Sequence, residues 1–505
     1  MNRRSFLRTA CAVALAAVAL GLTACKVNYY NFPQYNYAGR AVPPSQLANR
    51  VMVAIANPSA FSGGQLEILD ALRDQRFNVP DTITEFNISG YAGRVPTTIQ
   101  SFPEQQIGYV YGSGDGSFTR VSYASESTAG TVGGIPSSTD SVATTSTGAQ
   151  VYAASGAVGG VIVVDNTSGK SYDINLPGAQ YVFPNTGNSV VLVTVRNVVD
   201  GPASGTQTTF NLYRIVKLNN NVLPPAGTYA DCEPVNLPVY CAVPVKGIYD
   251  RPVSVVYSLD GSQAYVLNCG PECGGTTAGV SFLNTATLNV NYIPTGSDPS
   301  PVASTVAVPG GATVGLTDGT YLYVAGQYLL TSGAAKGYYT GKFSIITLGA
   351  TPVVNSSFPV PDGTHTKMLF ADNNTLWIGS TYCTGGANGY LASYVSPYSS
   401  TPGSINLNCL AVYQLGSGQT PTVVPQVTST TPVPYPNTNN NQYYYGDLTG
   451  ICWVQNLNKV YSAYGGQVHA FSTIAPYTEI NNQYITVQGT AENVVYMDAL
   501  TNDAN

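Results

Sequence analysis

The two histidines of the chain, His365 and His469, are the first candidates for acid–base chemistry. Histidine is the side chain whose ordinary pKa lies closest to neutral pH, which makes it the usual proton carrier in catalysis. His365 lies in "PDGTHTK" and is expected in a solvated loop, whereas His469 lies in the alternating pattern "QVHAFST" and is expected to pack within a strand. Neither has the surroundings of a nucleophile elbow. We expect no catalytic residue and keep His365, with its neighbouring acids, only as a residual candidate for the enzymatic alternative.

Seven of the nine cysteines lie beyond residue 200 and are candidates for disulfides, as the cysteines of exported proteins commonly are. Pairing each cysteine with its nearest neighbour in the sequence predicts the disulfides Cys232–Cys241, Cys269–Cys273 and Cys383–Cys409. Cys452, in the apolar segment "GICWV", is then left as a buried thiol. Other connectivities of the same cysteines stay open, because spacing alone does not determine pairing.

The sequence offers little to a metal ion or a cofactor. "CGPEC" (269–273) resembles half of a zinc site, but the chain has two histidines and no second short-spaced cysteine pair to complete four ligands. Asp115 in "GSGDGS" could belong to a calcium loop, yet it is one carboxylate among glycines and the EF-hand spacing is absent. No haem-attachment motif occurs. We therefore expect no metal and no cofactor.

The first fifty residues predict where the protein works. A basic start is followed by an uncharged apolar run over residues 10–21, the pattern of a signal peptide and too short to span a bilayer. "RRSFLR" (3–8) resembles the twin-arginine export motif, and "LTAC" (22–25) resembles a bacterial lipobox. We expect residues 1–24 to be removed, Cys25 to be acylated and residues 25–49 to form a tether. General secretion and an ordinary thiol at Cys25 remain the alternatives.

The identity of the residue after Cys25 bears on the destination of the predicted lipoprotein. Lys26 is not the aspartate that retains lipoproteins at the inner membrane, so the outer membrane is expected, on its periplasmic side or at the cell surface. Without residues 1–24 the chain carries 17 basic and 26 acidic residues. This acidic balance, with no basic cluster, argues against nucleic acid as a partner. The chain is expected to be a monomer that meets the membrane through Cys25.

Only 9% of the residues are charged, and β-forming and turn residues abound, which is typical of an all-β protein. One pattern recurs: an apolar strand, a tight Asp/Asn/Gly turn, a Tyr/Val strand, a loop and a further apolar strand. With the strands of each unit named A to D, the B strands centre near Val53, Val110, Val151, Val191, Val266, Val324, Ile378 and Val460. Four-stranded units at such spacings predict a single closed β-propeller over residues 50–505.

The predicted propeller has eight blades, or seven if the weak unit near Val110 is not a blade. "GQLEILDALRD" (64–74) is interpreted as a strand running into a turn, so no helix is expected after residue 50. The first unit lacks an A strand, and "ENVVYMDAL" (492–500) follows the last complete unit. We expect this surplus strand to pair beside Val53 and join both ends of the chain in one blade, which removes an open sheet edge.

The unit formed by "LDGSQAYV" (259–266) and "GVSFLNTATLNV" (279–290) resembles the YVTN-type propellers of bacterial surface proteins. The resemblance covers most of residues 50–505 but is strong in only three or four units. It implies a cell-envelope protein, and the lactonase-like members of the superfamily imply the enzymatic alternative. The acidic and basic set that such lactonases need around the channel is not recognisable in this sequence.

Strands that alternate in direction place the B–C and D–A connections at one end of the propeller and the A–B and C–D turns at the other. The A–B turns are short, and we assign the long insertions, including the segment with Cys232 and Cys241, to B–C and D–A connections. This end, with Tyr443, Tyr444 and Tyr445 as stacking candidates, is the predicted binding surface for an envelope protein or glycan. A lipid-anchored binding or scaffold module is the first hypothesis. A lactonase- or lyase-type enzyme and a structural surface-layer component are the alternatives.

Overall fold

A computed structural model describes residues 39–57, 64–76, 88, 90, 92–195, 210–219, 222–223, 230–288, 300–394, 407–425, 447–480, 485, 487 and 489–502. The chain divides into two compact units, of which the first comprises residues 1–42 and 46–48. The second unit, residues 43–45 and 49–505, contains every strand described below. The predicted acylation site Cys25 and the tyrosines at 443–445 lie outside the described residues.

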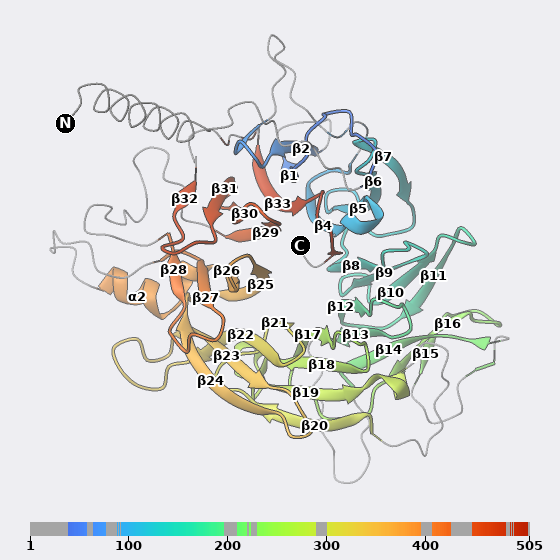
Figure 1. Ribbon diagram of the computed structural model, residues 1–505. Coiled ribbons are helices and arrows are strands. Elements are labelled where there is room, and N and C mark those ends of the chain that lie inside the picture. Colours follow the sequence, from blue (N-terminus) through green and yellow to red (C-terminus); the bar gives the residue numbers. More distant parts are fainter. Residues whose placement is uncertain are drawn as a thin grey trace, which may run out of the picture. The chain divides into compact units, whose positions relative to one another are not determined.

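The second unit is an eight-bladed β-propeller, as the repeat predicted (Figure 1). The weak unit near Val110 is a complete blade, which excludes the seven-bladed alternative. The strands of each blade are given in order from A to D. Blade 1 consists of β33 (Thr490–Tyr496), β1 (Arg50–Ala56), β2 (Gln65–Asp70) and β3 (Gln75–Arg76), and blade 2 of β4 (Pro96–Phe102), β5 (Ile107–Gly112), β6 (Ser117–Ser122) and β7 (Ser127–Val132). Blade 3 consists of β8 (Ser141–Thr144), β9 (Gln150–Ser155), β10 (Gly160–Asp165) and β11 (Lys170–Asn175), and blade 4 of β12 (Ala179–Pro184), β13 (Val191–Val195), β14 (Leu212–Lys217) and β16 (Tyr240–Pro244), with β15 (Asp231–Cys232) at its outer edge.

Blades 5 to 8 follow the same order. Blade 5 consists of β17 (Pro252–Tyr257), β18 (Gln263–Asn268), β19 (Gly279–Asn284) and β20 (Val302–Ala307), and blade 6 of β21 (Val314–Thr317), β22 (Tyr321–Leu329), β23 (Tyr339–Thr347) and β24 (Val353–Val360). Blade 7 consists of β25 (Thr364–Ala371), β26 (Thr375–Thr381), β27 (Leu410–Gln414) and β28 (Thr422–Val424), and blade 8 of β29 (Leu448–Val454), β30 (Lys459–Tyr464), β31 (Gln467–Ser472) and β32 (Glu479–Ile480). The A strands lie nearest the central axis in Figure 1.

Local sequence explains the tight A–B turns. Between β25 and β26, three residues join the paired Ala371 and Thr375, and two of them, Asn373 and Asn374, adopt left-handed φ values of 61° and 54°, which asparagine tolerates. Between β21 and β22, the Asp318 carboxylate accepts hydrogen bonds from the backbone N–H groups of Thr320 and Tyr321, at 2.8 and 2.7 Å. These turns set the register of the two inner strands in each blade.

The hydrophobic core lies between neighbouring blades. The B strands are buried on both sides, as β1 illustrates with all seven residues buried. Between blades 6 and 7, Tyr323, Phe343 and Tyr413 pack in one cluster, and a separate cluster joins blades 8 and 1. Each blade therefore depends on its two neighbours, which is why the ring has to close.

Closure occurs in blade 1, where the last strand β33 pairs antiparallel with the first strand β1. Val53 lies opposite Val494, so the predicted union of the two chain ends is confirmed. Beside this pair, the guanidinium of Arg50 contacts Asp498 at 2.6 Å and Glu126 at 2.9 Å. Its Nη1 also donates to the carbonyl of Tyr123 at 2.6 Å. We call this network the closing seam.

Three parts of the sequence prediction need correction or addition. A helix, α2 (Ala387–Tyr394), occupies the insertion between β26 and β27, where no helix was expected. The segment with Cys232 and Cys241 follows the C strand β14 and leads into the D strand β16, so it is a C–D connection and not a D–A connection. The connection 285–301 is also of the C–D kind. The prediction that all long insertions share one end is therefore wrong.

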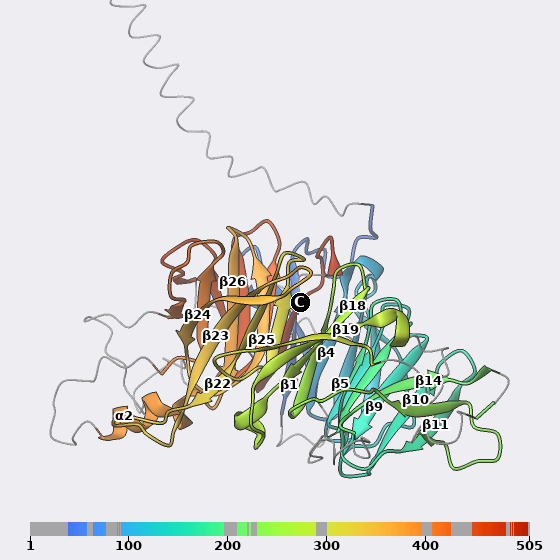
Figure 2. The ribbon, with the colours of Figure 1, turned by 90° about the horizontal axis from the view of Figure 1, so that it is seen from below.

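We name the end with the B–C and D–A connections the BC/DA rim, and the opposite end the AB/CD rim. In the side view of Figure 2, α2 lies at the BC/DA rim. "GQLEILDALRD" forms β2 and a following turn, as interpreted from the sequence. Within the described part of the chain, no helix is both long and apolar enough to cross a membrane.

Candidate functional site

A cavity of about 560 Å³ opens at the centre of the BC/DA rim, where the A strands of blades 4 to 7 begin. Its size lies within the range of ~300–1,000 Å³ that is usual for small-molecule sites. Its wall combines aromatic rings, hydroxyl groups and ionisable side chains, chiefly Tyr181, Phe183, Arg251, Glu272, Thr313 and His365. We call this cavity the channel mouth.

His365 is the most unusual group at the channel mouth. It is the second residue of β25 and only 1% exposed, so the expectation of a solvated loop residue is wrong. The strand begins directly after the "PDG" turn because His365 already pairs with Ser380 of β26, before a β-bulge. Burial lowers the pKa of its imidazole to about 4, an effect that the nearby Pro361 carbonyl opposes only weakly. The ring is therefore neutral at pH 7.

Neither ring nitrogen of His365 makes a hydrogen bond of good geometry among the described residues, although the Pro361 carbonyl lies near enough to favour the charged ring. Its backbone, in contrast, is well held, since the Thr313 hydroxyl donates to the His365 carbonyl at 2.9 Å. A buried polar group without a partner costs about 1–3 kcal/mol and is rare in native structures, so it calls for an explanation. A neutral imidazole has one donor and one acceptor to offer. His365 is one of the residues that line the channel mouth, although its two ring nitrogens are themselves covered.

Glu272 reaches the channel mouth from the short helix η3 (Gly270–Cys273), which lies in the B–C connection of blade 5. Its carboxylate accepts hydrogen bonds from the backbone N–H and the side-chain amide of Gln327, at 2.8 and 3.1 Å. Burial raises the pKa of the Glu272 carboxyl, although these hydrogen bonds favour its charged form. A Cβ at Gly311 would come within 2.2 Å of this carboxylate and within 2.6 Å of the Gln327 backbone nitrogen, which cannot give way, so glycine is needed there.

The connection that carries Glu272 is rigidly fastened. The disulfide Cys269–Cys273 closes η3, and the Asp250 carboxylate accepts three hydrogen bonds from Thr276 and Thr277 at 2.6–2.7 Å. Burial raises the pKa of the Asp250 carboxyl, but these bonds outweigh it and the net pKa is lowered. The neighbouring Arg251 lines the channel mouth, and among the described residues its guanidinium has no ion-pair partner within 4 Å. It is available to an anionic or hydroxylated ligand.

The insertions of blades 5, 6 and 7 join into one wall beside the channel mouth. The hydroxyl of Tyr339 donates to the Pro271 carbonyl at 2.8 Å, which links blade 6 to η3. Tyr338 stacks on Tyr390 of α2, with ring centroids 4.2 Å apart, which links blade 6 to blade 7. The Gln327 side chain accepts from the Gly363 N–H at 2.9 Å. The wall is thus continuous across three blades.

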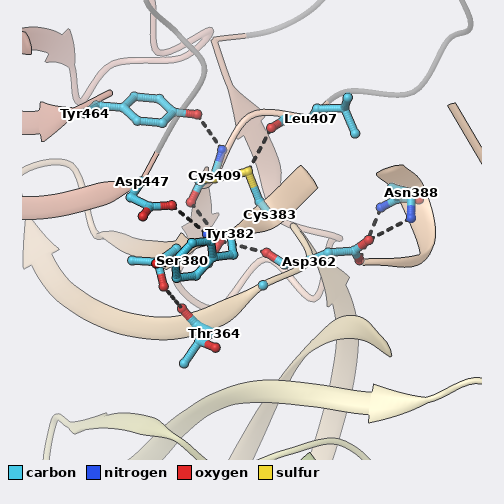
Figure 3. Close-up of a disulfide and its surroundings, with 12 residues drawn as sticks. Asp362, Thr364, Ser380, Tyr382, Cys383, Asn388, Leu407, Cys409, Asp447 and Tyr464 are labelled. Atoms are coloured by element: carbon cyan, nitrogen blue, oxygen red, sulfur yellow. Dashed lines mark hydrogen bonds between the residues drawn. A yellow bond between two sulfur atoms is a disulfide. The ribbon is translucent and has the colours of Figure 1, made fainter. Parts of the chain in front are cut away.

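Figure 3 shows how the blade 7 insertion is held at its base. The disulfide Cys383–Cys409 closes the insertion, and the buried Asp362 carboxylate accepts from the Asn388 N–H of α2 at 2.7 Å. The backbone N–H of Tyr382 donates to Asp447, just before blade 8, at 2.7 Å. Burial raises the pKa of the Asp362 carboxyl despite its hydrogen bonds. The described part of this insertion, up to the end of α2, is thereby held to the rim.

The structure places the other predicted residues elsewhere. All three disulfides pair as the nearest-neighbour rule predicted, and Cys452 is a buried free thiol. His469 is buried in β31, where Nδ1 lies 2.7 Å from Glu479, so the packed strand position is confirmed. The Asp115 carboxylate accepts from Ser117 at 2.8 Å within a turn. Among the described residues, no three His, Cys, Asp or Glu side chains gather as a metal site requires.

The sequence reasoning missed Glu272, Arg251 and Thr313 as members of a site. For Glu272 the sequence contained one signal: the residue lies between Cys269 and Cys273, and the disulfide between them keeps it at the BC/DA rim. Arg251 and Thr313 each directly precede an A strand and thereby face the axis, but this becomes visible only when the strand boundaries are known. A second cavity of about 320 Å³ lies further along the A strands and shares Phe183 with the channel mouth.

Neither a protein-family model nor a curated protein matches the chain. Among solved structures, hydrazine synthase of Kuenenia stuttgartiensis is 14% identical, with a TM-score of 0.44, covering 78% of this chain and 99% of that chain. The periplasmic gluconolactonase of Pseudomonas aeruginosa is 12% identical, with a TM-score of 0.42, covering 89% and 98%. AztD of Citrobacter koseri is 9% identical, with a TM-score of 0.42, covering 89% and 97%. We transfer no residue role from these proteins, and the propeller assignment follows from the strand pairing of this chain.

Proposed function

We propose that the protein is a lipid-anchored binding protein of the cell envelope, which takes the end of a glycan into the channel mouth. The observation that carries this proposal is the buried, neutral His365, which lines the cavity and whose two ring nitrogens make no hydrogen bond of good geometry among the described residues. Sugar hydroxyls both donate and accept hydrogen bonds, so they match a neutral imidazole. A carboxylate would match only its donor.

Other groups at the channel mouth support a glycan over a folded protein. Tyr181 and Phe183 offer apolar ring surface, and the hydroxyls of Thr313 and Thr364 lie on the same wall. Arg251 adds a planar set of donors suited to hydroxyl or carboxylate groups. A cavity of about 560 Å³ admits a few sugar units and excludes a protein domain. The rigid wall of blades 5 to 7 limits the ordering cost of binding.

The predicted location rests on separate support. Three disulfides are typical of a protein that works outside the cytoplasm. The lipobox-like "LTAC" supports acylation at Cys25, and two or more acyl chains anchor a protein stably. Labelling of the full chain with a fatty-acid analogue in cells tests this part. We expect label on the protein and none on the Cys25→Ser variant; equal labelling of both would contradict acylation at this cysteine.

The binding proposal is tested by titrating the full chain against an array of bacterial envelope oligosaccharides, including peptidoglycan disaccharides and lipopolysaccharide core sugars. The best oligosaccharide is then measured with the His365→Phe variant. We expect affinity to fall about tenfold or more, since one lost hydrogen bond is worth ~1 kcal/mol and an apolar ring leaves the sugar hydroxyl unpaired.

His469→Gln serves as the matched control, because glutamine can still reach Glu479 and His469 lies on a C strand away from the channel mouth. Thermal unfolding of each variant confirms that it is folded. The proposal fails if no oligosaccharide binds above background. It also fails if His365→Phe and His469→Gln change affinity equally.

A lactonase- or lyase-type enzyme is the second candidate, favoured by one observation. Neutral His365 and Glu272, whose carboxyl pKa is raised by burial, line the same cavity, and oppositely tuned groups are typical of acid–base catalysis. An imidazole pKa of about 4 makes a weak base at neutral pH, which is why we place binding first. Screening a lactone panel with the wild type and Glu272→Gln decides: activity lost in the variant would favour catalysis.

A further inference from the structure

The exposed aliphatic side chains of the propeller gather at one end. Leu259, in an A–B turn, is 74% exposed, and Leu237, in the C–D connection of blade 4, is 68% exposed. Nine such residues lie at the AB/CD rim: Leu72, Val222, Leu223, Val235, Leu237, Leu259, Val353, Ile474 and Leu500. At the BC/DA rim the described aliphatic counterparts are Val158, Ile248 and Leu329. The apolar surface therefore distinguishes the two rims.

These residues come from blades 1, 4, 5, 6 and 8, so they surround much of the AB/CD rim. Because these side chains are exposed, polar residues at the same positions would not reduce the packing of the hydrophobic core. The other turns of this rim are indeed polar. Large apolar side chains repeated on one face of a protein commonly mark a contact with a partner or a membrane. The question is which of these the AB/CD rim meets.

The attachment of the N-terminal segment answers this question. Ser45 donates two hydrogen bonds to the Glu126 carboxylate, from its N–H at 2.8 Å and from its hydroxyl at 2.5 Å. Glu126 lies in the C–D turn between β6 and β7, so the chain enters the propeller at the AB/CD rim. Cys25 precedes Ser45 by 20 residues. An anchor at Cys25 is therefore joined to the propeller at the AB/CD rim, the end of the fold that the chain reaches first.

We infer that the AB/CD rim rests on the membrane that holds the acylated Cys25, with its exposed aliphatic side chains in the headgroup region. The channel mouth then faces away from that membrane. This inference rests on the lipid anchor of the proposed function but not on the identity of the glycan. In this orientation the channel mouth is open to ligands that approach from the side away from that membrane.

The charges of the AB/CD rim identify the kind of lipid surface. Exposed Glu104, Asp260 and Asp318 are acidic, whereas Arg73 and Lys170 are basic. This mixture gives no basic patch that would attract anionic lipids. The contact is therefore apolar, and a zwitterionic bilayer of phosphatidylcholine or phosphatidylethanolamine suits it.

The test reconstitutes the acylated full chain into phosphatidylcholine vesicles whose acyl chains carry bromine, which quenches tryptophan at short range. Leu237→Trp and Leu259→Trp place a reporter on the AB/CD rim, and Ile248→Trp is the matched control on the BC/DA rim. Of the two native tryptophans, Trp377 is buried, but Trp453 is half-buried near the AB end of β29, so each added tryptophan is measured in a Trp453→Phe background. We expect brominated vesicles to quench most of the added fluorescence at positions 237 and 259 and none at 248.

The possible outcomes separate this inference from the anchor. Protein that floats with the vesicles but shows equal or no quenching at the three positions overturns the orientation and leaves the anchor intact. Acylated protein that does not float overturns both. Quenching at 248 alone would show that the opposite rim meets the membrane. Protection of positions 237 and 259 by self-association, seen in sedimentation without vesicles, would replace the bilayer by a second copy and overturn the inference.

Discussion

The closing seam and the channel mouth both bury polar side chains, but they satisfy them very differently. At the seam, Arg50 makes ion pairs with Asp498 and Glu126 and donates to a backbone carbonyl as well. At the channel mouth, His365 is buried to the same degree, at 1% exposure, and neither ring nitrogen makes a hydrogen bond of good geometry among the described residues. The same ring of blades thus contains one fully paired polar cluster and one that is incompletely paired.

This contrast separates stability from function. Burying a charge costs several kcal/mol unless it is paired, so the Arg50 network is tolerable only because its hydrogen bonds are complete. The imidazole of His365 forms no such network, and burying it without partners lowers the free energy of unfolding. We interpret the seam as the part of the molecule that keeps the ring closed. The channel mouth keeps its hydrogen-bonding capacity for something that binds there. Variants of the two regions should differ in stability and in binding if this division holds.

The largest effect is expected from breaking the seam. Arg50→Met should lower the free energy of unfolding by about 3–5 kcal/mol, because it leaves the buried Glu126 and the half-buried Asp498 without their cation. Denaturant titration measures this loss. Arg73→Met is the control: Arg73 also forms an ion pair, with Asp70 at 2.6 Å, but its side chain is 44% exposed. We expect a loss within about 1 kcal/mol there. Equal losses would mean that the seam is not special.

The second effect concerns the covalent links at the rim. Replacing Cys383 and Cys409 by serine opens a loop of sequence separation 26 and should cost about 2–4 kcal/mol. Replacing Cys269 and Cys273 opens a loop of separation 4 and should cost about 1.5 kcal/mol less, on the loop-entropy relation. Unfolding of both double variants measures the difference. A larger loss from the shorter loop would show that packing of η3, and not loop entropy, dominates.

The third effect is a pH dependence that belongs to the channel mouth. The unfolded chain binds a proton at His365 with a pKa near 6.5, whereas the folded chain does so only at a pKa of about 4. The folded state is therefore destabilised as the pH falls from about 6.5 to about 4, by at most about 3 kcal/mol. His365→Phe should abolish this contribution. Stability curves of the variant and wild type that stay parallel over this range would contradict the buried, neutral imidazole.

The smallest effect tests how the channel mouth is positioned. Thr313→Val removes the hydrogen bond to the His365 carbonyl and should lower stability by about 1 kcal/mol. Thr320→Val, at an exposed position in the A–B turn of the same blade on the opposite rim, is the control and should stay within about 0.5 kcal/mol. If Thr313→Val weakens oligosaccharide binding while Thr320→Val does not, the hydrogen bond positions His365. Unchanged binding in both variants would limit Thr313 to a structural role.

Much of the fold was predictable because it depends on local and periodic features. Turns such as "DNNT" and alternating Tyr/Val strands predict hairpins wherever they occur, and eight copies imply a ring. The pairing of Val53 with Val494 followed from counting strands, since one A strand was missing at the start and one was surplus at the end. The disulfides were predictable because the two cysteines of each pair are neighbours in the sequence and lie in or beside the same connection between strands.

The features that escaped prediction depend on long-range contacts. Helix α2 has no clear apolar periodicity and is held by Asp362 and by stacking on Tyr338, from outside its own segment. The segment with Cys232 was placed in the wrong connection because β15 adds a fifth strand at the edge of blade 4, so the true D strand comes later. His365 was misplaced because one bulge extends β25 toward its N-terminus.

The amino-acid sequence by itself determined the strands, their number, the closure of the ring and the cysteine pairs, because each follows from short-range chemistry repeated along the chain. Only the tertiary structure decided that His365, Glu272 and Arg251 share one cavity and that the exposed aliphatic side chains share the opposite rim. The reason is physical: a ring of blades brings one position from each unit to a common axis or face. Which residues meet there depends on where each strand begins and ends and where its bulges lie. The pairing between strands determines both.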